Sequence, residues 1–147
     1  MSILTCADIE PAQLEQLLER YAITVNTVGK KQKIPGSWFG EPEAGIIKNA
    51  LYIRADTPVH SALHEACHYI CMDPSRRKTL HTNAGGDYNE ENGVCYLSIL
   101  LSDYIEGFGR ARMFSNMDEW GYTFRLGSSK AWFEGDANDA IDWLTAY

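Results

Sequence analysis

Residues 57 to 72 constrain the fold most, because both ends of this segment carry helix-boundary signals. Thr57-Pro58 predicts a helix start, with threonine as the N-cap and proline at the first helical position. Asp73-Pro74 predicts an end near Met72, because proline disfavours a helical residue before it. The middle of the predicted helix holds His64-Glu65-Ala66-Cys67-His68.

The spacing of these polar residues favours a metal site. His64 and His68 are four positions apart, so a helix stacks them on one face and lets both imidazoles reach one ion. Zinc favours such nitrogen donors, and a catalytic zinc site keeps one position for water. Glu65 stands beside the first histidine, where it can take the proton of the metal-bound water as general base.

The third protein ligand is predicted on a second helix that begins at Asp87. Stepping by about 100° per residue places Glu90 within roughly 40° of an apolar stripe, which must pack against the metal-bearing helix. This stripe consists of Val94, Leu97, Leu101, Tyr104 and Phe108. The stripe through Glu91 is more polar. Glu90 is therefore the predicted ligand, and Glu91 and Asp87 remain alternatives.

These motifs resemble those of gluzincin-type zinc metallopeptidases and, more narrowly, of the ImmA/IrrE family. That family combines a His-Glu-x-x-His helix with a helix that opens Glu-x-Asn-x-Phe-Ala. The matching stretches here are residues 64–69 and, more loosely, 90–95, in which Cys67 replaces the usual glycine. The resemblance implies a zinc peptidase with its third ligand at Glu90. It also implies a Tyr or His that stabilises the oxyanion, for which Tyr88 is the first choice and His81 and Tyr104 are alternatives.

The rest of the chain predicts an α+β fold in one domain, residues 1–147. An amphipathic helix is expected over residues 8–21 and a strand over 23–28. Residues 45–54 predict a strand or a hairpin that turns at Lys48-Asn49, and this segment could offer an edge to an extended peptide. Residues 75–86 predict a loop whose basic cluster, 76–78, is exposed. One or two shorter helices are expected after residue 110.

Charge and cysteine usage limit the partners and the compartment. The net charge of −7, from 13 basic and 20 acidic residues, excludes nucleic acid and anionic membranes as default partners. Asp8 and Glu10 interrupt the apolar start, so no export signal is predicted, and a cytoplasmic location is expected. The four cysteines are too few and too irregular for a disulfide framework, and Cys67 and Cys71 are expected to be buried as small apolar residues.

The sequence thus predicts a zinc-dependent peptidase that acts on a peptide or protein. Its metal ligands are expected to be His64, His68 and Glu90, with Glu65 as general base and Tyr88 at the oxyanion. Two alternatives remain. One is a non-catalytic zinc module that stabilises a regulatory or interaction surface, and the other is a metal hydrolase of a non-peptide substrate. The sequence leaves the oligomeric state open.

Overall fold

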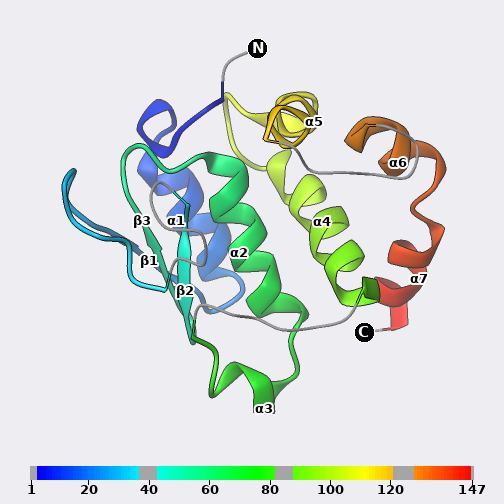
Figure 1. Cartoon of the computed structure of the whole chain (residues 1–147), viewed down its shortest axis with the longest axis horizontal. Helices are drawn as coiled ribbons and strands as arrows, with labels where there is room; N and C mark the ends of the chain where they lie inside the picture. The colour runs from blue at the N-terminus through cyan, green and yellow to red at the C-terminus, as the bar shows by residue number, and fades with distance from the viewer. Residues whose placement is uncertain (1–2, 37–42, 82–87, 121–127, 147) are drawn as a thin grey trace.

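A computed structural model describes residues 3–36, 43–81, 88–120 and 128–146, and it confirms the predicted α+β class (Figure 1). A short 3-10 helix, Cys6–Asp8, opens the chain. The strands are β1 (Thr24–Thr27), β2 (Gly45–Ile47) and β3 (Ala50–Ile53). The helices are α1 (Pro11–Glu19), α2 (Val59–Cys71), α3 (Pro74–Arg77), α4 (Tyr88–Ser102), α5 (Gly109–Glu119), α6 (Ser129–Gly135) and α7 (Asn138–Ala146).

The three strands form one sheet with β3 in the centre. β3 pairs with β1 in parallel and with β2 in antiparallel orientation. The hairpin turn falls at Lys48-Asn49 as predicted, and Lys48 has a positive φ of 52°, which a tight turn requires. The segment 45–54, which was predicted to offer a strand edge to a peptide, forms most of its backbone hydrogen bonds within the chain. β3 is interior, and the amides of Ile46 and Lys48 donate to Gly36 and Leu80.

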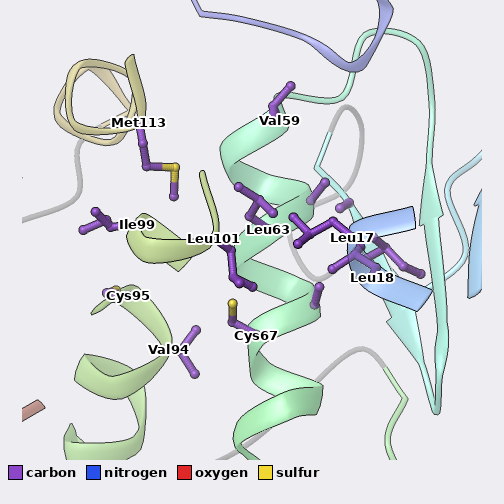
Figure 2. Packing of buried hydrophobic residues seen from close by; sticks show 14 of the residues in the cluster. Leu17, Leu18, Val59, Leu63, Cys67, Val94, Cys95, Ile99, Leu101 and Met113 are labelled. Carbon is purple, nitrogen blue, oxygen red and sulfur yellow. The ribbon is translucent and has the colours of Figure 1, made fainter. Parts of the chain in front are cut away.

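Helix α2 lies between the sheet and α4 (Figure 1). On the side of the sheet, Leu63 of α2 packs near Leu17 and Leu18 of α1 (Figure 2). On the other side, Val94 and Leu101 of α4 face the same helix. All five side chains are at most 5% exposed, so the orientation of α2 is determined by contacts on both sides.

The start of α2 is held by the N-terminal segment rather than by the predicted cap. Pro58 occupies the N-cap position and makes no side-chain cap hydrogen bond. The Thr57 hydroxyl instead accepts a hydrogen bond from the amide of Arg54, at 2.8 Å. The amide of Val59 donates to the carbonyl of Leu4 at 2.9 Å, so residues near the start of the chain satisfy this end of α2.

In the described part of the chain after α4 there are three helices, α5 to α7, where one or two were predicted. α4 packs against α5 and α7 as well as against α2, so it is enclosed on several sides (Figure 1). Among the described residues, no helix combines the length and apolar character that crossing a membrane requires.

Candidate metal centre

The two histidines of α2 converge as their spacing predicts. Their rings are buried, at 9% and 8% exposed, with centroids 4.7 Å apart. The Nε2 atoms of His64 and His68 are 3.1 Å apart. Burial is the main cause that lowers the pKa of His68 to about 4, with the charge of His64 adding to it. His68 is therefore neutral at pH 7, which is the form that binds a metal.

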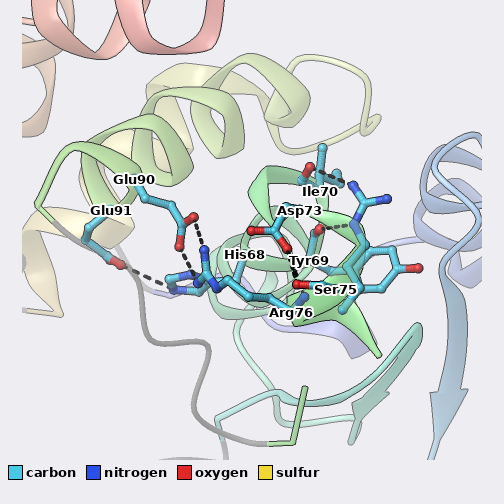
Figure 3. Close-up of polar contacts among 9 residues, drawn as sticks. His68, Tyr69, Ile70, Asp73, Ser75, Arg76, Glu90 and Glu91 are labelled. Atoms are coloured by element: carbon cyan, nitrogen blue, oxygen red, sulfur yellow. Dashed lines mark hydrogen bonds and ion pairs between the residues drawn. The ribbon is translucent and has the colours of Figure 1, made fainter. Parts of the chain in front are cut away.

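Glu91 of α4 completes a set of three donors. Its Oε1 lies 3.0 Å from Nε2 of His64, and its Oε2 lies 3.3 Å from Nε2 of His68. Figure 3 shows the Glu91 carboxylate directed at the His68 ring. Partial burial by itself would raise the pKa of Glu91, but the hydrogen bond and charge of His64, together with the charge of His68, hold it below its usual value.

These three groups fit a zinc ion. Bonds of about 2.0–2.1 Å to nitrogen and oxygen place two ligands of a tetrahedral ion roughly 3.3 Å apart. The nitrogen–nitrogen distance of 3.1 Å is close to that value, and so are the distances from Oε1 of Glu91 to His64 (3.0 Å) and from Oε2 of Glu91 to His68 (3.3 Å), so each histidine is near a different oxygen of the carboxylate. Two neutral imidazoles and one carboxylate are also a known ligand set of catalytic zinc.

Glu65 lies beside this donor set. One of its carboxylate oxygens is within 4.8 Å of a ring nitrogen of each histidine. Burial is the main cause that raises the pKa of Glu65 to about 7. The charge of His64 opposes this rise, and the charges of Glu43 and Glu91 add to it. A carboxylate in this position can accept a proton from a water molecule bound near the histidines.

Glu90, the predicted third ligand, is directed at a different partner. Its two carboxylate oxygens accept hydrogen bonds of 2.6 and 2.8 Å from Nη1 and Nη2 of Arg76, in a two-pronged ion pair (Figure 3). The side chain of Glu90 is only 6% exposed. Its burial, which the sequence predicted correctly, is therefore explained by an arginine rather than by a metal. The structure brings Glu91, the alternative ligand, to the histidines.

The polar stripe through Glu91 is buried, contrary to the reasoning that favoured Glu90. Ser98 and Ser102 are 0% exposed, and their hydroxyls donate to the carbonyls of Cys95 and Ile99 one turn earlier. The helix itself satisfies these hydroxyls, so they can be buried without other partners. Tyr104, assigned to the apolar stripe, is 61% exposed and lies beyond the end of α4.

The basic cluster that was predicted as an exposed loop is partly a helix, α3, with a structural role. Asp73 caps it by accepting a hydrogen bond of 2.9 Å from the amide of Arg76. Arg77 donates to the carbonyls of Tyr69 and Ile70, at 2.9 Å each, and so binds the end of α2. The two arginines of α3 therefore have structural roles, because Arg76 pairs with Glu90 and Arg77 caps the end of α2. No pattern in the sequence predicts either contact.

Of the other residues predicted for the site, His81 and Tyr104 are exposed, and Tyr88 and Asp87 fall wholly or partly outside the described residues. Tyr88 begins α4, but its side chain lies outside the described part, and Asp87 lies in the undescribed range 82–87. His81 is exposed and forms a bridge with Ile47 at the edge of the sheet. Tyr104 lies beyond the end of α4 at Ser102, which is itself about 16 Å along the helix axis from Glu91 at 1.5 Å per residue.

His60 and the cysteines complete the surroundings of the donor set. His60 is fully buried, with its ring edge-on to Trp120 and the ring centroids 4.8 Å apart. Cys67 and Cys71 are buried, as predicted. Cys95 is the residue that the sequence reasoning missed, because its Sγ lies within 4.8 Å of ligand atoms of both His64 and Glu91.

Comparison of the chain with models of protein families, with curated proteins and with solved structures gives no match.

Proposed function

We propose that this chain is a zinc-dependent peptidase in which His64, His68 and Glu91 hold the ion and Glu65 is the general base. The observation that carries the proposal is the convergence of two imidazole nitrogens and one carboxylate at 3.0–3.3 Å, with a second carboxylate alongside. The choice of peptides as substrates rests on the resemblance of residues 64–68 to the gluzincin motif.

The roles of the protein groups follow from their positions. A bound zinc ion supplies a Lewis acid that lowers the pKa of water to about 7 and polarises a carbonyl group. His64 and His68 provide neutral donors on a rigid helix, and Glu91 provides the negative charge. Glu65 accepts the proton of the attacking water and then delivers it to the leaving amine, as a general base and then a general acid.

A second function is favoured by one observation, the position of Cys95 beside His64 and Glu91. A structural zinc site usually closes with a fourth protein ligand, and a thiolate is a common one. The corresponding function is a non-catalytic zinc module in which the ion joins α2 to α4.

Elemental analysis of protein purified without added metal, followed by cleavage of a peptide library, distinguishes the two functions. The peptidase proposal expects one zinc per chain and cleavage that is lost when zinc is chelated and restored when zinc returns. One zinc per chain with no cleavage of any library peptide would favour the non-catalytic module. Protein that neither contains nor takes up zinc would contradict both.

A further inference from the structure

The donor set of the candidate metal centre has a sulfur neighbour. Cys95 lies one helical turn after Glu91 on α4, and four positions correspond to a rotation of about 40°, so both side chains leave the helix on the same side. The Sγ atom of Cys95, a ligand atom of His64 and a carboxylate oxygen of Glu91 all lie within 4.8 Å of one another. The thiol is 5% exposed and forms no disulfide.

We propose that Cys95 is a fourth protein ligand of the ion and closes its coordination shell in a resting state. This inference rests on the proposed function, because it assumes that the histidines and Glu91 bind zinc. The thiol proton passes to solvent as the sulfur–metal bond forms, because zinc binds the thiolate. An ion held by all four protein groups would have no open position for water, so hydrolysis would require Cys95 to release the ion first.

The distances allow this ligation with a small rearrangement. A zinc–sulfur bond of about 2.3 Å and a zinc–nitrogen bond of about 2.0 Å place these two ligand atoms roughly 3.5 Å apart around a tetrahedral ion. The observed limit of 4.8 Å exceeds that separation by on the order of 1 Å. Rotation of a cysteine side chain between its staggered rotamers changes the position of the sulfur by more than this difference.

Two other cysteines provide matched controls. Cys67 and Cys71 of α2 are free thiols and are as buried as Cys95, at 0% and 2% exposed. Neither belongs to a group of potential ligands that the described residues bring together. Replacing either with serine therefore tests the effect of losing a buried thiol without losing the proposed ligand.

The experiment replaces zinc with cobalt(II) and records the absorption spectrum. We expect wild-type protein to bind one cobalt per chain with a thiolate-to-cobalt charge-transfer band in the near ultraviolet. The band should disappear in Cys95→Ser and persist in Cys67→Ser and Cys71→Ser. A cobalt-loaded wild type without the band, or a Cys95→Ser variant that keeps it, overturns the inference and leaves the peptidase proposal intact. Failure to bind cobalt at all overturns both.

X-ray absorption of the zinc-loaded wild type keeps the inference testable if Cys95→Ser does not fold. The spectrum should require one sulfur at about 2.3 Å in the zinc shell. A shell fitted entirely by nitrogen and oxygen would show that Cys95 is only a buried core thiol.

Discussion

Replacing Arg76 with methionine should destabilise the protein more than replacing its partner Glu90 with glutamine. The two side chains form a two-pronged ion pair between α3 and α4, but they are buried unequally, at 34% and 6% exposed. Arg76→Met leaves a carboxylate buried without its counter-charge. Glu90→Gln leaves the guanidinium with a neutral acceptor and with access to water.

The unequal burial sets the expected magnitudes. Removing one partner of a fully buried pair costs about 3–5 kcal/mol. Because Arg76 is partly solvated, we take the lower end, about 3 kcal/mol, for Arg76→Met. Glu90→Gln should cost about 1 kcal/mol, the value of a weakened hydrogen bond. For a chain of this size, 3 kcal/mol corresponds to a fall in Tm of about 9 °C.

Urea and thermal unfolding of chelator-treated protein measure both effects without a contribution from bound metal. The double variant Arg76→Met/Glu90→Gln serves as the control, and it should recover part of the stability lost in Arg76→Met. An Arg76→Met variant that costs less than about 1 kcal/mol would refute the reasoning. Glu90 would then not depend on Arg76, and its carboxylate would be available to a metal.

Three further predictions concern the base, the packing of α4 and one surface ion pair. Glu65→Gln should retain zinc and lower kcat for peptide cleavage by about 10²–10⁴; loss of zinc would instead make Glu65 a ligand. Gly93→Ala should lower the urea midpoint, because the new Cβ would lie 2.7 Å from the Trp143 ring. The overpacking costs about 1–3 kcal/mol, which outweighs the gain of about 1 kcal/mol in helix propensity. A variant more stable than the wild type would show that α7 does not pack there. The hydrogen bond and charge of Arg110 lower the pKa of Asp103. The pair therefore contributes its full stabilisation of the fold above the ordinary aspartate pKa of about 3.9, and this contribution is lost as the pH falls through the lowered pKa. The stability difference between wild type and Asp103→Asn should therefore shrink between pH 5 and pH 2, and a constant difference would contradict the pair.

Local signals were sufficient to predict α2 and the hairpin. The helix ends at Cys71, one residue before the predicted Met72, because Asp73-Pro74 cannot continue it. The spacing of His64 and His68 depends only on helix geometry, so their convergence could be predicted without any knowledge of the fold. The turn at Lys48-Asn49 is likewise a property of neighbouring residues.

The predictions that failed depended on contacts between distant segments. The threonine cap was predicted from residue preference, but residues 4–6 pair with the start of α2 and replace it. The buried face of α4 was inferred from its apolar residues. Val94 and Leu101 of the apolar stripe do face α2, but α4 packs on several neighbours and its serines bond to their own helix. The polar stripe through Glu91 is therefore buried as well, and apolar periodicity did not separate Glu91 from Glu90.

The choice between Glu90 and Glu91 could not be made from the sequence for a related reason. Both positions are partly enclosed at the start of α4, and burial alone does not distinguish a metal ligand from one half of an ion pair. The distinction comes from Arg76, which approaches from α3, an element that the sequence did not predict.

The zinc affinity of two isosteric variants tests the central claim most directly. Glu91→Gln and Glu90→Gln are measured by competition with a chromogenic chelator, with circular dichroism to confirm that both fold. Loss of an outer-shell partner typically weakens zinc binding by about 10–100-fold, so loss of a direct ligand should exceed about 100-fold. We predict that Glu91→Gln loses affinity to this extent and that Glu90→Gln binds zinc like the wild type. The reverse result would contradict the ligand assignment and the position of α4 against the two histidines.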